Sequence, residues 1–395
     1  MKLPLILALL PLAAAHAAEP LTPGPVPAEV RERFHLAPFY QKHVAVGGLP
    51  IVGSAKVSAA ALAECAWIVS HMLERRPDIL AALRDGGVRF AIMAHDEYTT
   101  DVPEHADLKP RIYWDRRARG LGATPEAPAV SGAEENLLSF PGDPYPREII
   151  SIHEFGHAIH EVGMKALDPT FDTRLREAYA KAIAAGLWKN TYAATNRQEY
   201  WAEAVQDWFD NNDANNALHN DISTREKLKA YDPGVAALCA EVFGDIPWRY
   251  TKPAARTPAD RAHLAGFDPA KAPRFHWRFE AVPEHPRVTF QCAAGELELE
   301  FAATDGTRLG QLLAQIQEGY YSGGNAEFSE GVLNLSAAGR TPAGAEIPAG
   351  EGRWKIQLGD APADGLSAKV VKGGVLVPGL IRDKSTRVQR IVRLN

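Results

Sequence analysis

The sequence predicts an α+β fold in which a mainly helical part precedes a small β-rich C-terminal domain. Apolar residues recur at spacings of three and four along residues 57–83 and 149–162, the period of amphipathic helices. From residue 287 onward, short runs alternate apolar with polar side chains, and Gly-rich turns separate them. Between these parts, residues 251–273 are enriched in Pro, Ala and Arg, which indicates a domain boundary.

Length and charge narrow the class of protein. The chain has 395 residues, of which 46% are hydrophobic, enough for a sizeable core in two or three domains. Its 43 Lys and Arg residues against 49 Asp and Glu residues give a formal net charge of -6. This mild acidity gives no support for a nucleic acid or an anionic membrane as a partner.

The first residues have the pattern of a secretory signal peptide, which we assign to residues 1–17. Lys2 supplies a positive start, residues 3–12 form an apolar run, and Ala15-His16-Ala17 matches the small-x-small cleavage pattern. The apolar run is shorter than the ~20 residues of a transmembrane helix, so we expect no stable membrane insertion. We expect a mature protein that begins near Ala18 and is secreted or periplasmic.

Three cysteines, Cys65, Cys239 and Cys292, would remain after cleavage. An oxidising compartment permits one disulfide among them, and the sequence does not show which two pair. None of them has C-x-x-C spacing, which argues against a cysteine metal site.

Local signals predict the individual elements. Residues 57–83 should form two helices, the first capped by Ser58 and the second beginning after a break at Arg76-Pro77. Residues 88–94 alternate as a strand does, and we expect the edge strand of a small sheet within residues 119–138. Three helices follow, at about 144–162 (Asp143 as N-cap, Pro144 first, Gly163 at the end), 172–185 and 196–209. Beyond the boundary we expect strands at 287–292, 296–301, 355–358, 369–378 and 387–394, and one short helix at 309–317.

His153, Glu154 and His157 form the motif H-E-x-x-H within the first of the three central helices. Residues four apart lie on one face of an α-helix, so both imidazoles can bind the same metal ion. Glu154 lies beside that ion without being a ligand, where its carboxylate can act as a general base. Two nitrogen ligands, a base and an open position for water are the requirements of a zinc hydrolase, and we expect one Zn2+ ion.

The third ligand should come from a later helix. A metzincin would have a histidine at position 163, where this chain has Gly163, so that class fails. In a site of two histidines and a glutamate, the candidates are Glu199 and Glu203, one turn apart on a helix. If Glu199 binds the metal, Glu203 would hold the other ring nitrogen of a ligand histidine. If Glu203 binds it, Asp207 would take that supporting role.

Tyr192 precedes these glutamates in the pattern tyrosine, six residues, Glu199, three residues, Glu203. A tyrosine hydroxyl near the metal can stabilise an oxyanion. Together with H-E-x-x-H, this segment resembles the catalytic domain of anthrax lethal factor and related gluzincin-type secreted endopeptidases. The resemblance covers residues 147–209. It implies these roles: zinc ligands His153, His157 and Glu199, general base Glu154, oxyanion stabiliser Tyr192, and a supporting carboxylate at Glu203.

We therefore expect a zincin-like metallopeptidase domain over residues 18–255 and a β-rich accessory domain over residues 275–395. The expected function is that of an exported zinc metalloendopeptidase, in which metal-activated water attacks a peptide bond of a protein or peptide substrate. The substrate backbone would lie along the edge strand within 119–138. The alternative is a zinc-containing, non-catalytic binding protein of the cell envelope that works through its β-rich domain.

Overall fold

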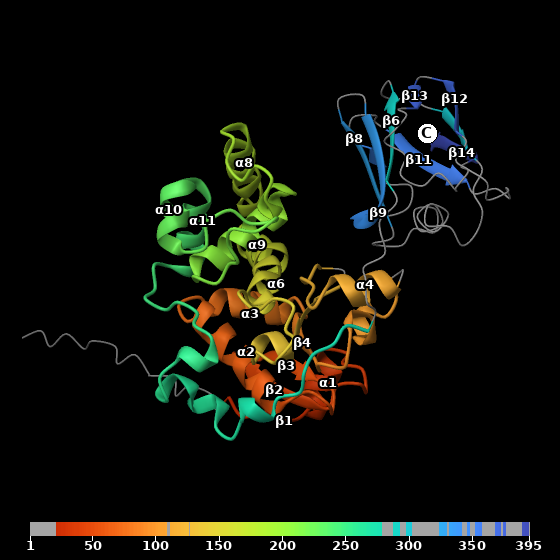
Figure 1. Cartoon of the computed structure of the whole chain (residues 1–395). Helices are drawn as coiled ribbons and strands as arrows, with labels where there is room; N and C mark the ends of the chain where they lie inside the picture. Colours follow the sequence, from red (N-terminus) through yellow and green to blue (C-terminus); the bar gives the residue numbers. More distant parts are fainter. Residues whose placement is uncertain are drawn as a thin grey trace, which may run out of the picture. The chain divides into compact units, whose positions relative to one another are not determined.

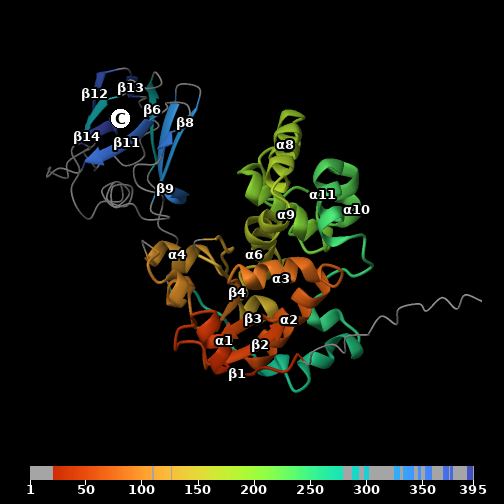
Figure 2. The ribbon, with the colours of Figure 1, turned by 180° about the vertical axis from the view of Figure 1, so that it is seen from behind.

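Figure 1 shows the computed structural model of the chain, and Figure 2 shows it from behind. The structure describes residues 21–108, 111–125 and 127–278, and then the strands between residues 287 and 394. The expected signal peptide, residues 1–17, and the expected helix at 309–317 lie outside the described residues.

Two compact units make up the chain. Residues 1–92 and 147–269 form the first, and residues 93–146 and 270–395 form the second. The expected domains, 18–255 and 275–395, stay a prediction.

The first unit contributes strands to a small five-stranded sheet. Its strands β1 (Gly24–Pro25), β2 (Lys42–Val46) and β3 (Leu49–Gly53) pair antiparallel, and β3 pairs parallel with β4 (Arg89–Met93). A parallel pair needs a crossover, which α2 (Ala59–Met72) and α3 (Pro77–Asp85) supply. The strand order β1-β2-β3-β4-β5 ends with β5 (Ala129–Ala133). The edge strand expected within 119–138 is therefore confirmed.

The two helices expected within residues 57–83 are confirmed, because α2 ends at Met72 and α3 begins at Pro77. Buried Glu64 on α2 accepts hydrogen bonds from the two terminal nitrogens of Arg256, at 2.6 and 2.8 Å. Nε2 of His263 lies 2.8 Å from the same carboxylate. A buried charge must be paired, so these contacts hold the segment after residue 250 against α2.

The three expected central helices are present, with one correction. The helices α8 (Phe171–Ala184) and α9 (Arg197–Trp208) lie where they are expected. The first helix, α6 (Ile150–Ala158), begins six residues later than predicted and continues through a π-helical turn, Ile159–Met164, into α7 (Lys165–Leu167). Asp143 therefore does not cap it, and Gly163 does not end it.

The corrected positions have local causes. Asp143 accepts hydrogen bonds from the backbone nitrogen of Tyr145 and from the side chain of Asn136, so its carboxylate stabilises a turn before the helix. At Gly163, a Cβ would meet Cγ2 of Ile79 at 3.1 Å. This glycine is thus needed for close packing against α3 rather than for a helix end.

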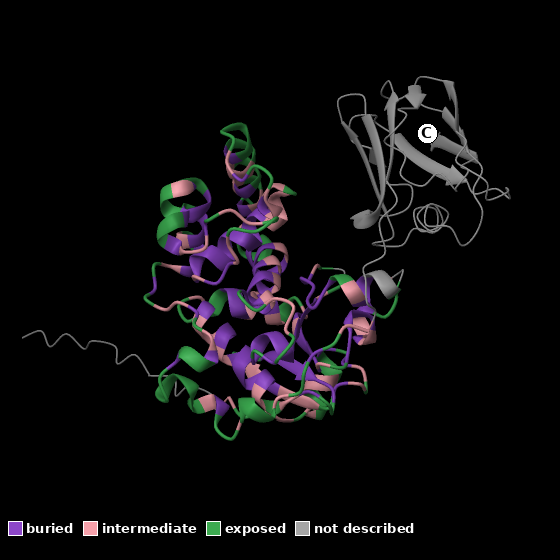
Figure 3. Cartoon of the chain, viewed as in Figure 1, coloured by how far each residue is buried: buried purple, intermediate pink, exposed green. Residues whose placement is uncertain are grey.

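The remaining helices complete the described fold. Buried residues gather in the sheet and along α6 and α9 (Figure 3). The other α-helices are α1 (Ala28–Arg33), α4 (Arg111–Arg117), α5 (Glu134–Leu137), α10 (Arg225–Tyr231) and α11 (Pro233–Phe243). Single 3-10 turns occur at Thr99–Asp101, Pro103–His105, Tyr192–Ala194, Pro253–Ala255, Ala259–Leu264 and Pro269–Lys271.

Two antiparallel sheets make up the described C-terminal part. One has the order β10-β11-β14-β7-β12 and the other the order β13-β6-β9-β8. The sequence did not predict β8, β9 or β10, and the single strand expected at 369–378 is two strands, β12 and β13. The strands are β6 (Arg287–Cys292), β7 (Glu298–Phe301), β8 (Gly324–Ser329), β9 (Val332–Thr341), β10 (Glu346–Ile347), β11 (Gly352–Gln357), β12 (Ala368–Lys372), β13 (Gly374–Leu376) and β14 (Gln389–Leu394). The fold is thus of the mixed α+β class.

Two further sequence expectations concern the membrane and the cysteines. Within the described residues, no helix combines the length and the apolar character that crossing a membrane requires. Cys65 and Cys239 are buried free thiols, so they do not form a disulfide with each other.

Candidate metal centre

The H-E-x-x-H helix α6 packs directly against α9. Gly156 faces Val205, whose side-chain carbons would lie 3.4–3.5 Å from a Cβ built at position 156. Nε1 of Trp201 donates a hydrogen bond of 2.9 Å to the carbonyl oxygen of Gly156. On the side of the sheet, the ring of Phe155 contacts Phe90 of β4, with centroids 5.9 Å apart. Helix α6 is thereby held between the sheet and α9.

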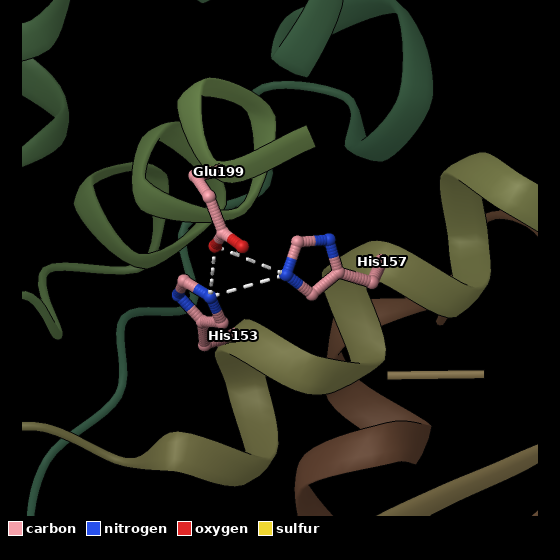
Figure 4. A group of neighbouring side chains, drawn as sticks. All are labelled: His153, His157 and Glu199. Carbon is pink, nitrogen blue, oxygen red and sulfur yellow. Dashed lines mark hydrogen bonds and ion pairs between the residues drawn. The ribbon is translucent and has the colours of Figure 1, made fainter. Parts of the chain in front are cut away.

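Three side chains from these two helices converge on one point (Figure 4). Nε2 of His153 lies 3.1 Å from Oε2 of Glu199, and Nε2 of His157 lies 3.3 Å from the same oxygen. The two Nε2 atoms are 3.2 Å apart. In a tetrahedral zinc site with metal–ligand distances of about 2.0–2.1 Å, neighbouring ligand atoms are about 3.3 Å apart. The three atoms therefore fit one zinc ion, with a fourth position left for another ligand.

A helix cap places Glu199 in this group. The side-chain oxygen of Asn196 accepts a hydrogen bond of 2.9 Å from the backbone nitrogen of Glu199, which fixes the first turn of α9. The Glu199 side chain keeps 18% of its surface exposed, and those of His153 and His157 keep 9% and 13%. The convergence point is thus enclosed by protein yet open on one side.

The charges of the group stabilise one another. Burial alone would lower the pKa of His153, but the hydrogen bond to Glu199 and the charges of Glu154 and Glu203 raise it to about 10. Burial likewise would raise the pKa of Glu199, yet the two imidazoles hold it well below its usual range. Both shifts reflect the close approach of the Glu199 carboxylate to the two imidazoles.

Behind the two histidines lies a buried polar layer on the same face of α9. Glu203 reaches Nδ1 of His153 at 3.5 Å, and its other oxygen accepts a hydrogen bond of 3.0 Å from Asn212. Oδ1 of Asp207 also accepts a hydrogen bond from Asn212. Asp207 is not part of the group that His153, His157 and Glu199 form. Of the two glutamates that the sequence left open, Glu199 is therefore the one that faces both Nε2 atoms.

The sequence analysis missed Gln206. Its Oε1 lies 2.8 Å from Nδ1 of His153, a shorter contact than that of Glu203. The spacing held a usable signal, because positions 199, 203 and 206 recur at four and three residues and so share one helix face.

Glu154 and Tyr192 both lie near His153. Glu154 follows His153 directly on α6 and is half-buried, and its charge contributes to the raised pKa of His153. Tyr192 begins the 3-10 turn before α9, and its ring centroid lies 6.2 Å from that of His153. The backbone nitrogen of Tyr192 donates to the carbonyl oxygen of Leu218 at 2.7 Å, which anchors the turn.

A second group of possible ligands, His160, Glu161 and Asp172, lies nearby. Nε2 of His160 contacts Asp172 at 2.9 Å, whereas Nδ1, on the other side of the ring, lies 3.4 Å from Glu161. The two carboxylates therefore contact different nitrogens of the His160 ring. Asp172 is paired with Arg197 at 2.9 Å and with Arg176. We therefore read the group as an ion-pair network that links the π-helical turn to α8 and α9.

The chain has limited similarity to known proteins. No protein-family model matches the chain, and neither does any curated protein. Among solved structures the chain is similar to a Pro-Pro endopeptidase from Paenibacillus alvei, with 23% sequence identity and a TM-score of 0.29. That match covers 50% of this chain and 97% of the other.

Proposed function

We propose that this chain is an exported zinc metalloendopeptidase that hydrolyses peptide bonds in protein or peptide substrates. The observation that supports it is the convergence of His153, His157 and Glu199, whose ligand atoms lie 3.1–3.3 Å apart. Two imidazole nitrogens and one carboxylate suit zinc, and three protein ligands leave the open position of a catalytic site. Export rests on the signal-peptide pattern of residues 1–17 alone.

The third ligand makes the proposed site a gluzincin-type centre for one ion. Glu199 lies on the Nε2 side of both histidines, while Glu203 lies on the Nδ1 side of His153. A bound zinc ion would supply a Lewis acid that polarises the scissile carbonyl and makes water acidic near neutral pH. Glu203 then acts as a supporting carboxylate, not as a ligand.

Glu154 is the proposed general base. It removes the proton of the attacking water and returns it to the leaving amine, which needs a carboxylate beside the ligand cluster but outside it. Its position next to His153 on α6 supports this role.

Tyr192 is the proposed oxyanion stabiliser. Its hydroxyl would donate a hydrogen bond to the oxygen that becomes negatively charged when the carbonyl is attacked. The anchored turn that carries it, with its ring 6.2 Å from that of His153, supports this role.

Replacement of Glu154 tests the proposal. The variant Glu154→Gln should bind zinc as tightly as the parent protein, because the ligand atoms are unchanged, and should lose peptide hydrolysis by at least ~100-fold. Exposed Glu177 on α8 provides the matched control, Glu177→Gln, which should keep both properties. Cleavage of a diverse peptide library is followed by mass spectrometry, and bound zinc by elemental analysis.

Two results would contradict the proposal. Hydrolysis by Glu154→Gln at the parental rate would exclude the carboxylate as base. A zinc-loaded parent that cleaves no peptide of the library would favour the alternative, a zinc-containing binding protein of the cell envelope.

A further inference from the structure

The ring nitrogen of His153 that faces away from Glu199 has a defined partner. Nδ1 lies 2.8 Å from Oε1 of Gln206, and Oε1 of Glu203 is more distant at 3.5 Å. A carboxylate was the expected partner of this nitrogen. The structure instead gives the shorter contact to a neutral amide, on a side chain that is completely buried.

The orientation of the Gln206 amide is fixed from its other end. Its Nε2 donates to Oε2 of Glu148 at 3.0 Å and lies 3.4 Å from the carbonyl oxygen of Asn211. Both partners accept hydrogen bonds from an N–H group, so the NH2 end of the amide faces them. The amide oxygen is therefore left to face His153.

The orientation of the amide determines the proton position on His153. An amide oxygen only accepts hydrogen bonds, so Nδ1 of His153 must carry a hydrogen. In the neutral ring the lone pair then resides on Nε2, the atom 3.1 Å from Glu199 and 3.2 Å from Nε2 of His157. Burial of both Gln206 and Glu148 keeps water from competing for these bonds.

We infer that Gln206, held by Glu148, is a positioning residue that keeps His153 in the tautomer whose Nε2 can bind the metal. The inference rests on the proposed function, since the ion is part of that proposal. Partners of this kind orient ligand histidines in metal sites, and a carboxylate often takes the role. A neutral amide does so here without adding a charge beside Glu148 and Glu203.

The test compares variants of the full chain by zinc affinity, measured in competition with a chromophoric chelator. Gln206→Leu removes the acceptor at similar size and should weaken zinc binding by about 10–100-fold. Gln206→Glu restores an acceptor toward Nδ1 but adds a charge beside Glu148 and loses the donor to it, so it should recover part of the affinity. The control, Gln41→Leu, replaces an exposed glutamine just before β2 and should bind zinc as the parent does.

A spectroscopic measurement separates orientation from packing. In the zinc-loaded parent, the Nδ1 proton of His153 should give a slowly exchanging, downfield NMR signal, because it is buried and hydrogen-bonded. The signal should be lost in Gln206→Leu and present in Gln206→Glu. Tight zinc binding by Gln206→Leu with this signal unchanged would overturn the role of Gln206 alone. A parent that binds no zinc would instead overturn the proposed function together with this role.

Discussion

Trp201 and Gly156 join the two helices of the metal centre through a hydrogen bond of 2.9 Å from the indole nitrogen to the carbonyl oxygen. One turn further along α9, Val205 lies against Gly156, and a Cβ at position 156 would be 3.4 Å from it. That distance is an ordinary van der Waals contact, so the two helices are in direct contact at this point. The distance between the histidines of one helix and Glu199 of the other depends on this contact.

Removal of the indole nitrogen of Trp201 should weaken the packing of α6 against α9. The variant Trp201→Phe keeps an aromatic ring between Phe171 and Phe243 but loses the donor to Gly156. We expect the free energy of unfolding to fall by about 1–3 kcal/mol, from the lost hydrogen bond and the smaller ring. Denaturant unfolding of the metal-free protein measures this change in the free energy of unfolding.

Trp208, on the same helix, provides the control for ring size. It is also fully buried, and its indole nitrogen has no hydrogen-bond partner among the described residues. Trp208→Phe should therefore cost less than Trp201→Phe, by about 1 kcal/mol. Equal losses in the two variants would show that the bond to Gly156 contributes nothing to stability.

Zinc affinity should distinguish the two candidate glutamates. Glu199 faces both Nε2 atoms at 3.1 and 3.3 Å, so Glu199→Gln should weaken zinc binding by more than ~100-fold. Glu203 is a 3.5 Å neighbour of Nδ1, and Glu203→Gln should weaken it by ~10-fold at most. Competition with a chromophoric chelator measures the zinc dissociation constant of each variant. A greater loss of zinc affinity in Glu203→Gln than in Glu199→Gln would make Glu203 the ligand.

Acid should abolish the stabilisation that Asp172 provides. Burial acts to raise the pKa of Asp172, but hydrogen bonds from Arg197 and His160 lower it from 3.8 to about 2. A carboxyl whose pKa falls on folding stabilises the folded state above its unfolded pKa and loses this effect as the pH drops through the folded value. The effect is therefore complete above pH 3.8 and disappears toward about pH 2.

The corresponding variant is Asp172→Asn, which cannot ionise. At neutral pH it should unfold about 1 kcal/mol more easily than the parent, a modest loss because solvent partly screens these charges. The gap should narrow between pH 3.8 and about 2, as followed by denaturant unfolding across this range. A gap that stays constant with pH would mean that the charge of Asp172 does not stabilise the fold.

Local patterns in the sequence predicted α2, α3, α8 and α9 of the first unit but not α1, α10 or α11. Asn196 was recognised as the start of α9, because a cap needs only the side chain and the backbone three residues later. Asp143 carried the same signal but stabilises a turn with Asn136, a partner outside the helix. Gly163 matched a helix end, yet its role is contact with Ile79. Tertiary contacts decided both cases, and no local pattern records them.

The residues of the candidate metal centre also differ in whether local spacing or tertiary packing identifies them. His153 and His157 could be paired from their spacing alone, because one helix turn separates them. Choosing between Glu199 and Glu203 required the rotation of α9 about its axis relative to α6, which is set by the packing of Gly156 against Val205.

Cys65 and Cys239 are free thiols, so no disulfide between them cross-links the chain. A bound metal ion would provide a cross-link of another kind. Glu199 follows His157 by roughly 40 residues, so a zinc ion bound by both would close a loop of that length. Like a disulfide, such a cross-link restricts the unfolded chain and so favours the folded one. Metal loading would then protect α8 and the start of α9 from local opening, and loss of the ion would make this segment easier for proteases to cleave.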